Sequence, residues 1–439
     1  MDFPIMIGLI MLVAFLITLF AGFPVAVSMI ICGVVGCMFL LRDPMSAFTF
    51  LTSGVVSTFT SYSICVAPMF ILMGELASET GLGANLFAAL QTLVGRTKGG
   101  LASAVQVVCA IFGAICGSGS ATSAMMCRIA YPEMRKYNYS QKLAAGCIAS
   151  GSCLATLIPP SVLLITYGIA VEESIGKLFV GGIITGVVLM LLFVITIQIW
   201  CKLNPSIASQ GERSTMKEKW IAIRKGNFIE IVLIFGFSMG GMFIGWFTPT
   251  EAGAVGTAGM LIVSILFKRL KFKMIVDAAA HTLTLCGMMY CLLAASTVFG
   301  KFFTLTMIPK ALGNLVSDLA LPNVVVILII TIIYLILGCF VDALPLMLLT
   351  APIFLPVMQV MGYNPVWFGC YVVVLMGLAA VTPPVGISCY ITAGSIEEKI
   401  ELMTVFKGSI PFIFAFVADA LLMAFFPGIA TWLPEIMYT

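Results

Sequence analysis

Two adjacent prolines occur twice in this chain, each time in the middle of a long apolar segment. The first pair is Pro159-Pro160 and the second is Pro383-Pro384. Proline has no N–H to donate, and its ring clashes with the carbonyl four residues earlier, so each pair predicts an interruption in a helix. An unsatisfied backbone group in a bilayer costs several kcal/mol, so such a break is expected only where it lines a cavity or binds a ligand.

The composition identifies the solvent that surrounds these segments. The chain has 439 residues, of which 61% are hydrophobic and 9% are charged, and its mean hydropathy is +1.15. This balance predicts an all-α polytopic membrane protein. The 14 Cys residues are scattered singly and there is one His, so the sequence predicts no metal site built from Cys or His and no cofactor. The net charge of +3 does not indicate nucleic-acid binding, because the basic residues lie in short loops.

Apolar runs divide the chain into two similar halves on either side of a basic loop at 204–226. In the first half, 1–203, we expect scaffold spans at about 4–41, a hairpin at about 100–137 and a broken helix at about 143–170. In the second half, 227–439, the equivalents are spans at about 227–267, a hairpin at about 322–360 and a broken helix at about 366–395. Both hairpin runs are nearly twice the length of about 20 residues that crosses a bilayer. Re-entrant hairpins explain this length; a full crossing followed by an interfacial helix is the alternative.

The two halves also match residue by residue. Residues of the same type recur at nearly the same separation across most of each half: Phe23 with Phe247, Gly74 with Gly300, Pro132 with Pro356, and the two proline pairs with each other. Single matches occur by chance, but a shared separation predicts an internal repeat.

The distribution of Lys and Arg predicts how the repeats are oriented. If the loop that carries Arg213, Lys217, Lys219, Arg224 and Lys225 is cytoplasmic, most other basic residues lie on that side as well. Only four fall on the opposite side: Arg42, Lys177, Lys301 and Lys310. In this orientation the two hairpins open to opposite sides, so the repeats are inverted and both termini lie outside.

The candidate site consists of the hairpin tips and the helix breaks. In the first half these residues are Gly117, Ser118, Gly119, Ser120, Thr122, Ser123, Pro159, Pro160 and Ser161. In the second half they are Gly338, Asp342, Thr382, Pro383, Pro384 and Gly386. The N-terminus of a half-helix favours a carboxylate, whereas free carbonyls and hydroxyls favour Na⁺. We therefore expect an anion and Na⁺ here, with Ser118, Asp342 and Thr382 as candidate Na⁺ ligands.

Purely structural roles could also explain the same residues. The glycine- and serine-rich stretch at 117–123 could be a seam where helices pack closely. Asp342, an acid inside a long apolar run, either caps a helix or ligates a cation. The matching position in the repeat favours a binding site for the stretch at 117–123, whereas both roles of Asp342 stay open and both place it at the hairpin tip.

Inverted repeats with broken helices are the construction of secondary transporters. Na⁺ is favoured over H⁺ as the coupling ion, because the first tip and the first break contain no carboxylate. A channel would show a continuous polar pore instead. An intramembrane serine hydrolase is disfavoured, because Cys116 stands where a Gly-x-Ser-Gly motif requires glycine. The sequence therefore does not predict an enzyme.

Several of these segments resemble the signatures of one family, the large membrane (M) subunit of tripartite ATP-independent periplasmic (TRAP) transporters. They are the stretch at 117–124, the stretch at 158–182, Asp342 with Pro345, and the stretch at 382–386. The resemblance covers essentially the whole chain. One departure is Thr185 before Gly186, where the family has proline.

The resemblance implies an elevator mechanism that imports an organic carboxylate, such as a C4-dicarboxylate, sialic acid or a sugar acid, together with Na⁺. It also implies two partners, a small four-helix membrane subunit (Q type) and a periplasmic substrate-binding protein (P type), and a bacterial inner membrane. A stand-alone Na⁺/anion symporter of the same architecture is the nearest alternative.

Overall fold

The computed structural model describes residues 3–94, 97–209, 215–225, 228–318 and 322–438. Every regular element in this part of the chain is helical, which confirms the all-α prediction. Eight helical segments are long and apolar enough to cross a membrane. Because the described residues also include shorter apolar helices such as Gly100–Cys116 and Pro365–Val381, the architecture mixes full spans with partial ones.

The first half of the chain contains eleven α-helices and one 3₁₀ helix within the described ranges. They are α1 (Phe3–Phe20), α2 (Val25–Leu41), α3 (Pro44–Thr60), η1 (Tyr62–Cys65), α4 (Val66–Glu79), α5 (Leu82–Val94), α6 (Gly100–Cys116), α7 (Gly119–Lys136), α8 (Gln141–Ser152), α9 (Leu154–Leu157), α10 (Val162–Val171) and α11 (Ile175–Leu203). Helix α6, a two-residue tip and α7 form the first hairpin, and the double proline separates α9 from α10.

The second half has nearly the same order of helices. It contains α13 (Phe228–Ile244), α14 (Pro249–Leu266), α15 (Phe272–Leu305), α16 (Ile308–Asp318), α17 (Asn323–Gly338), α18 (Ala343–Val360), α19 (Pro365–Val381), α20 (Ile387–Ser395) and α21 (Leu402–Phe425). Helices α17 and α18 form the second hairpin, and α19 and α20 flank the second double proline. Two helices have no counterpart, α12 (Met216–Lys225) before this half and α22 (Gly428–Met437) after it.

One asymmetry between the halves concerns α15. Its 34 residues run without interruption, whereas the equivalent part of the first half is divided into α3, η1 and α4, with an extended residue at Ser61. The stretch around Ser61 is rich in hydroxyls, including Thr58, Thr60 and Ser63, which compete with the helix for backbone hydrogen bonds. The stretch at 283–289 in α15 is mostly apolar and offers little such competition. Helix α3 is not among the spans expected from the sequence.

Close contacts place α4 and α15 against the two hairpins. A Cβ added to Gly74 of α4 would lie 2.5 Å from the Cα of Cys116, at the end of α6. A Cβ added to Gly300 of α15 would lie 3.3 Å from the Cβ of Pro352 in α18. Helix α4 therefore contacts the first hairpin near its tip, whereas α15 contacts the second hairpin well along its second arm.

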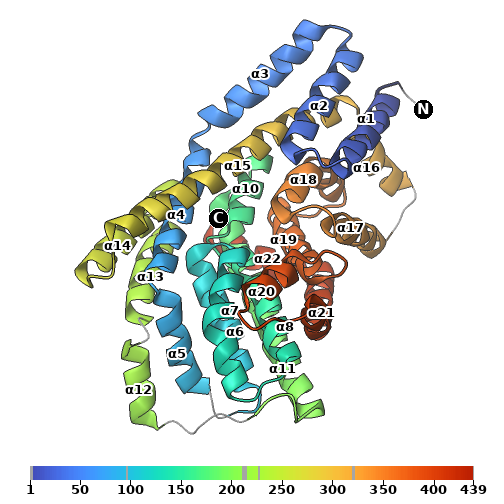
Figure 1. Cartoon of the computed structure of the whole chain (residues 1–439). Coiled ribbons are helices and arrows are strands. Elements are labelled where there is room, and N and C mark those ends of the chain that lie inside the picture. Colours follow the sequence, from blue (N-terminus) through green and yellow to red (C-terminus); the bar gives the residue numbers. More distant parts are fainter. Residues whose placement is uncertain (1–2, 95–96, 210–214, 226–227, 319–321, 439) are drawn as a thin grey trace.

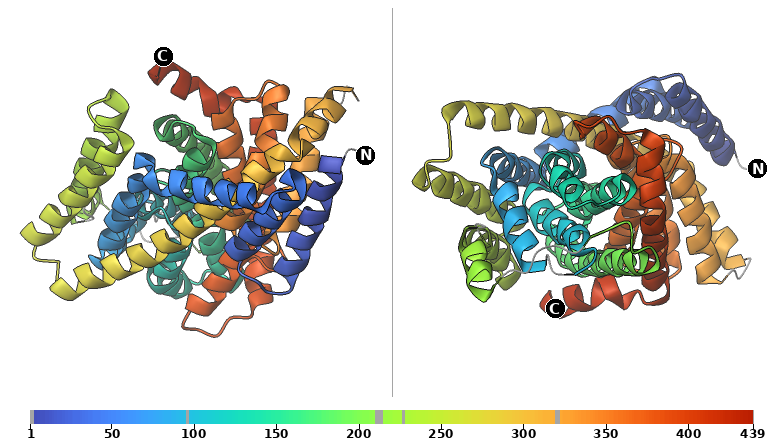
Figure 2. Two further views of the ribbon diagram at one scale, coloured as in Figure 1. Left: turned by 90° about the horizontal axis from the view of Figure 1, so that it is seen from above. Right: turned by 60° about the horizontal axis from the view of Figure 1, so that its bottom comes forward.

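Figures 1 and 2 show how these elements are arranged. Helix α15 runs as a long diagonal past α4, α10 and α18, all of which it contacts, with α1–α3 gathered at one end. The hairpin of α6 and α7 and the broken helices lie side by side on the other side of α15. This arrangement leaves the first hairpin in the interior of the bundle, with α17 of the second hairpin and α12 at its edges.

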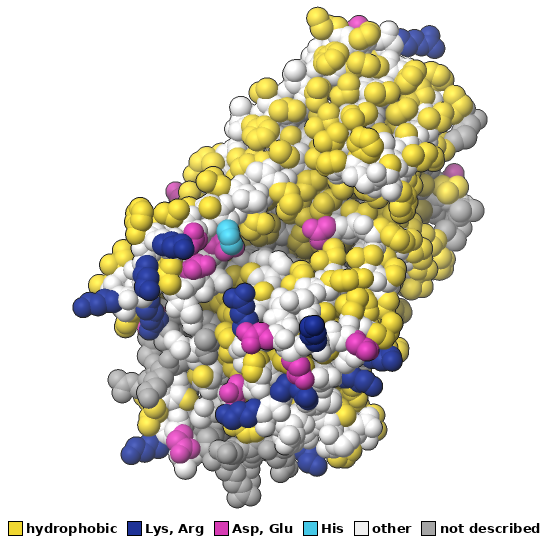
Figure 3. All heavy atoms as spheres, in the orientation of Figure 1, with side chains coloured by type: hydrophobic (Ala, Val, Ile, Leu, Met, Phe, Trp, Pro, Cys, Tyr) yellow, Lys and Arg dark blue, Asp and Glu magenta, His cyan; other side chains and the backbone are white. Residues whose placement is uncertain are grey.

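Hydrophobic side chains cover the end of the visible face that carries α1–α3, whereas most of its Lys and Arg side chains gather toward the opposite end (Figure 3). This separation is the pattern that the positive-inside rule expects of a protein with one cytoplasmic end. Arg213, which contributed to the predicted orientation, lies outside the described residues, and so does Arg96. The inverted relation of the repeats and the sidedness of the termini stay predictions.

Candidate functional site

Both hairpin tips and both helix breaks contribute to one pocket of about 490 Å³. It is lined by the first residues of four helices: Gly119 and Ser120 of α7, Val162 and Leu163 of α10, Ala343 and Leu344 of α18, and Ile387 and Ser388 of α20. The first N–H groups of a helix have no carbonyl partner within that helix, and its N-terminus carries a partial positive charge. Four of these N-termini converge on a single pocket, so the backbone itself makes this site favourable for an anion.

The first hairpin tip touches the first break directly. Gly117 has φ +62°, and a Cβ added there would lie 2.4 Å from the carbonyl oxygen of Pro160. Only glycine suits this left-handed conformation and this close approach to a backbone carbonyl. Ser118 then begins α7, and its side chain accepts a hydrogen bond from the N–H of Ala121 at 3.4 Å. The Gly-Ser pair therefore turns the chain and brings the tip against the break.

Asp342 begins the second arm of the second hairpin. Its carboxylate accepts a hydrogen bond from the N–H of Ala343 at 2.8 Å, and its side chain is exposed at the wall of the pocket. Among the described residues that line the pocket, Asp342 is the only one with an ionisable side chain. The capping bond, one of the two alternatives for this residue, is therefore present, and the role of Asp342 as a cation ligand stays a prediction.

The predicted residues divide into two groups in the structure. Those that line the pocket are Gly117, Ser118, Gly119, Ser120, Gly338 and Asp342. Those that do not line it are Thr122, Ser123, Pro159, Pro160, Ser161, Thr382, Pro383, Pro384 and Gly386. The residues of the second group lie next to lining residues in the sequence but do not line the pocket themselves.

Hydrogen bonds explain why several of these residues do not reach the pocket. The hydroxyl of Thr122 donates to the carbonyl of Ser118 at 2.8 Å, and that of Thr382 donates to the carbonyl of Leu378 at 2.6 Å. Ser161 is fully buried and donates to the carbonyl of Thr156. These hydroxyls satisfy carbonyls near the helix ends. Of the three candidate Na⁺ ligands, Ser118 and Asp342 line the pocket and Thr382 does not.

The other residues that line the pocket were not predicted from the sequence. Thr156 and Ser388 lie within one turn of the double prolines, and their hydroxyl types could have identified them. The apolar wall gave no such signal; it includes Met376, Ala379 and Ala380 of α19, and Ile71, Leu285 and Met288 from α4 and α15. The last three belong to helices that contact the hairpins rather than to the hairpins themselves.

Contacts between the halves hold the first hairpin in place. Ser123 of α7 and Thr392 of α20 are both fully buried, and their hydroxyl oxygens lie 2.8 Å apart. Further along α7, Tyr131 donates to the carboxylate of Glu398 at 3.0 Å, and Arg135 approaches the same carboxylate at 3.3 Å. The second arm of the first hairpin is therefore joined to the segment that follows the second break.

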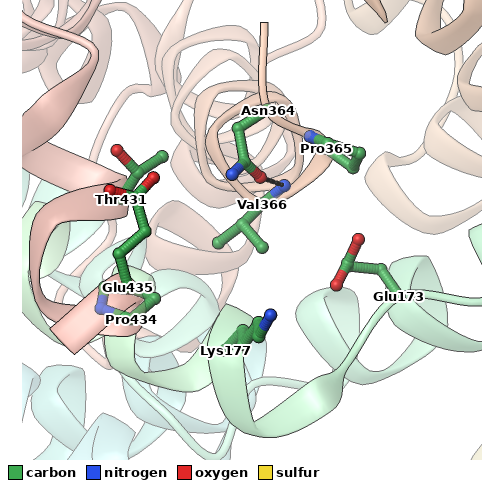
Figure 4. Close-up of a pocket in the computed structure, with 8 residues that line it drawn as sticks. All are labelled: Glu173, Lys177, Asn364, Pro365, Val366, Thr431, Pro434 and Glu435. Carbon is green, nitrogen blue, oxygen red and sulfur yellow. Dashed lines mark hydrogen bonds between the residues drawn. The ribbon is translucent and has the colours of Figure 1, made fainter. Parts of the chain in front are cut away.

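Two other pockets lie away from the tips. One of about 870 Å³ is formed between α3, η1, α10, α15 and α18. A smaller one of about 130 Å³ lies between the α10–α11 turn, the start of α19 and α22. Figure 4 shows Glu173, Lys177 and Glu435 around this smaller pocket, with the side chain of Asn364 accepting a hydrogen bond from the N–H of Val366 at 2.8 Å.

Solved structures with a similar fold are membrane transporters. The Alcanivorax borkumensis YdaH transporter aligns with a TM-score of 0.61 and 13% identity, over 87% of this chain and 89% of that one. Neisseria gonorrhoeae MtrF, whose structure illuminates a class of antimetabolite efflux pumps, aligns with a TM-score of 0.57 and 12% identity, over 97% and 96%. At this identity the similarity shows the fold alone: that of helical membrane transporters.

Sequence comparison then identifies the family. The model described as "Tripartite ATP-independent periplasmic transporter, DctM component" matches residues 12–429, and the chain belongs to this family. A C4-dicarboxylate TRAP transporter large permease protein of Pseudomonas aeruginosa is 28% identical over 92% of this chain and 93% of its own length. An ectoine TRAP transporter large permease protein of Halomonas elongata is 29% identical over 99% and 98%.

Proposed function

We propose that this protein is the membrane permease of a Na⁺-coupled, binding-protein-dependent secondary transporter that imports an organic carboxylate. The observation that carries the proposal is the convergence of four helix N-termini on one pocket that has no basic side chain among its described lining residues. Backbone N–H groups bind a carboxylate without a charged side chain. The relatives' names give C4-dicarboxylate, sialic acid, 2,3-diketo-L-gulonate and ectoine as cargoes.

Na⁺ is the proposed coupling ion. The helix C-termini at Gly117 and Gly338 lie at the same pocket as the N-termini, together with the hydroxyls of Ser118 and Ser388 and the carboxylate of Asp342. Such oxygens are the ligands that hard cations prefer. Ser118 and Asp342 are the proposed Na⁺ ligands. Thr382 is left out of this set, because its hydroxyl is bonded to its own helix.

An elevator movement is the proposed mechanism. Helices α4 and α15 would form part of a fixed scaffold, and the hairpins with the broken helices would move along it as one unit. The bonds from α7 to Thr392 and to Glu398 support movement as a unit, because they join elements of both halves. The proposed orientation in a bacterial inner membrane places the basic loop in the cytoplasm and both termini in the periplasm.

The proposed partners are a small four-helix membrane subunit and a periplasmic substrate-binding protein. The family description as one component of a tripartite transporter supports this. A related isethionate permease of Oleidesulfovibrio alaskensis carries the name DctMQ, and this chain spans 64% of its length. A stand-alone Na⁺/anion symporter is the second candidate, and a channel is the candidate of a different class.

Uptake of a labelled carboxylate panel into proteoliposomes tests the proposal. The liposomes contain the chain with its small partner, and the assay runs with and without the binding protein and with a Na⁺ gradient, an H⁺ gradient or neither. We expect saturable uptake that requires both Na⁺ and the binding protein. Uptake without the binding protein would identify a stand-alone symporter, and flux that ignores all conditions would identify a channel.

Asp342→Asn is the matched test of the site in the same assay. Loss of a charge-assisted interaction of about 1.5–3 kcal/mol predicts a decrease in Na⁺-driven uptake of about tenfold or more, with normal membrane insertion. Glu435→Gln, an exposed acid outside the pocket, is the control and should leave uptake unchanged. Unchanged Na⁺ dependence in Asp342→Asn would remove this residue from the proposed site.

A further inference from the structure

The two halves of the scaffold are equivalent at positions separated by 226 residues. The hydroxyl of Tyr290 donates to the carbonyl of Ile64 at 3.0 Å, and these residues are 226 apart. When two repeats are related by a twofold axis, residues near the axis contact their own counterparts. Gly74 and Gly300 have the same separation, and each is the point where its helix approaches a hairpin. Helix α4 and the second part of α15 are therefore counterparts.

This equivalence relates the pocket at the hairpin tips to the larger pocket of about 870 Å³. Ile71 of α4 lines the first pocket, and its counterpart Thr297 of α15 lines the second. One turn further along each helix, the counterpart of Glu75 is Lys301. The same place on the scaffold thus carries a negative charge in one half and a positive charge in the other.

Lys301 is the only basic side chain among the described residues that line the larger pocket. Its Nζ lies 3.4 Å from the hydroxyl of Ser53, and no carboxylate of the described residues lies within 4.0 Å of it. Thr297 and Thr304 of its own helix and Ser57 of α3 line the same pocket, and the hydroxyl of each donates to a carbonyl of its own helix. Lys301 is therefore the one group of this lining with a positive charge to offer an anion.

Two carboxylates also line this pocket, from Glu172 and Glu173 at the α10–α11 turn. Glu173 accepts a hydrogen bond from the N–H of Ser174 and also lines the smaller pocket, where Lys177 is present (Figure 4). The two glutamates follow α10, which belongs to the part proposed to move, whereas Lys301 belongs to the proposed scaffold.

Glu75 has acidic surroundings instead. It lies one turn beyond Ile71 along α4, and its side chain retains 17% exposure. Its carboxylate is 3.6 Å from Nδ1 of His281, and Glu79 follows one turn later. Asp277 precedes His281 by one turn on α15. Figure 3 shows acidic side chains beside the histidine on this face, with Lys or Arg side chains next to them. Glu75 and Glu79 therefore place two acidic side chains one and two turns beyond Ile71 along α4.

The geometry points to an electrostatic device for capture and release at these equivalent positions. Lys301 collects the organic anion in the pocket on the proposed outer side, and Glu75 hastens its departure on the proposed inner side. The inference rests on the proposed function, because it assumes an anionic cargo. Fixed charges do not change the final gradient, which the coupling ion sets; they change the rates of capture and release.

A cysteine reporter measures the potential in the pocket without relying on transport. Thr304→Cys places a thiol three residues from Lys301 on the same helix face, in a background where the exposed Cys65 and Cys291 are replaced by serine. Its rates of reaction with an anionic and a cationic methanethiosulfonate reagent are compared. Lys301→Gln should lower the anionic-to-cationic rate ratio by about three- to tenfold at low salt and by less than about twofold at 1 M salt.

Matched variants separate charge from structure. Lys301→Arg should preserve the ratio, and Lys310→Gln, which removes an exposed charge outside the pocket, should leave it unchanged. In proteoliposomes, Lys301→Gln should slow uptake at subsaturating cargo by about threefold or more with an unchanged maximal rate, and high salt should remove the difference. Glu75→Gln should make uptake about threefold more sensitive to inhibition by cargo preloaded inside.

Each outcome is decisive for the inference. An unchanged reagent ratio in Lys301→Gln overturns it, and so does a changed ratio together with unchanged subsaturating uptake. If the reagent ratio changes but the unmutated transporter takes up no carboxylate under any gradient, the proposed function fails while the potential in the pocket has still been measured. The two failures are therefore distinguishable.

Discussion

Ser296 of α15 is predicted to stabilise a carbonyl that a proline leaves without a donor. Pro352 lies inside α18 and has no N–H, so the carbonyl of Leu348, four residues earlier, loses its intrahelical partner. The hydroxyl of Ser296, which is 3% exposed, donates to this carbonyl at 2.6 Å. The bond joins the proposed scaffold to the second hairpin, so its loss should loosen this contact.

The structure sets the size of the effect. Ser296→Ala would leave a buried carbonyl unsatisfied, at a cost of about 1–3 kcal/mol. For a chain of this length that corresponds to a decrease of about 1–3 °C in the unfolding temperature. Pro352→Ala restores an N–H to α18, so the carbonyl regains a partner within its own helix. In that background Ser296→Ala should cost less than about 0.5 kcal/mol.

A double-mutant cycle checks this reasoning. The thermal unfolding of the purified protein is followed for the unmutated chain, the two single variants and the double variant. The expected result is a coupling of about 1–2 kcal/mol between the two substitutions. Equal destabilisation by Ser296→Ala in both backgrounds would refute the assignment of the serine to the proline-freed carbonyl.

Two further predictions concern stability. Gly74→Ala should destabilise the protein by about 1–3 kcal/mol, because the added Cβ would lie 2.5 Å from the backbone of Cys116. Gly287→Ala should not destabilise it, because no atom lies within 4 Å of the added Cβ. Thermal unfolding of the two variants distinguishes these outcomes. The hydrogen bond from Tyr131, together with the bonds from Gln141 and Arg135, holds the pKa of Glu398 below its usual 4.5. These bonds therefore stabilise the protein at neutral pH, and their contribution is lost as the pH falls below 4.5 and the carboxylate becomes protonated. The unfolding temperature should therefore decrease more steeply below pH 4.5 in the unmutated chain than in Glu398→Gln, with Glu397→Gln as the control; parallel curves would contradict this assignment.

Local chemistry explains which features could be predicted from the sequence. The break between α9 and α10 follows from the missing N–H groups of Pro159-Pro160, and the hairpin at 100–137 follows from a run too long for one crossing. Both effects act within a few residues of their cause. The observed arms of that hairpin, Gly100–Cys116 and Gly119–Lys136, lie close to the predicted limits for this reason.

The features that escaped prediction depend on contacts between distant segments. Met376 and Leu285 line the pocket only because α19 and α15 pack beside the tips, and an apolar residue in a membrane segment carries no sign of such a role. The hydroxyl of Thr382 was expected at the site, but it donates to the carbonyl of Leu378 at the end of its own helix. The bond between Ser123 and Thr392 joins residues 269 apart, a distance at which no local pattern operates.

Recognition by helix N-termini has a practical consequence for experiments on this protein. The groups proposed to hold the anion are backbone N–H groups, which every residue except proline supplies, so replacing side chains one at a time leaves them in place. An alanine scan would therefore detect the side chains of the pocket, such as Ser118 and Asp342, and would not detect the backbone donors. Replacing single amides by esters at the starts of α7, α10, α18 and α20 would remove the donors directly and show how the affinity is divided among them.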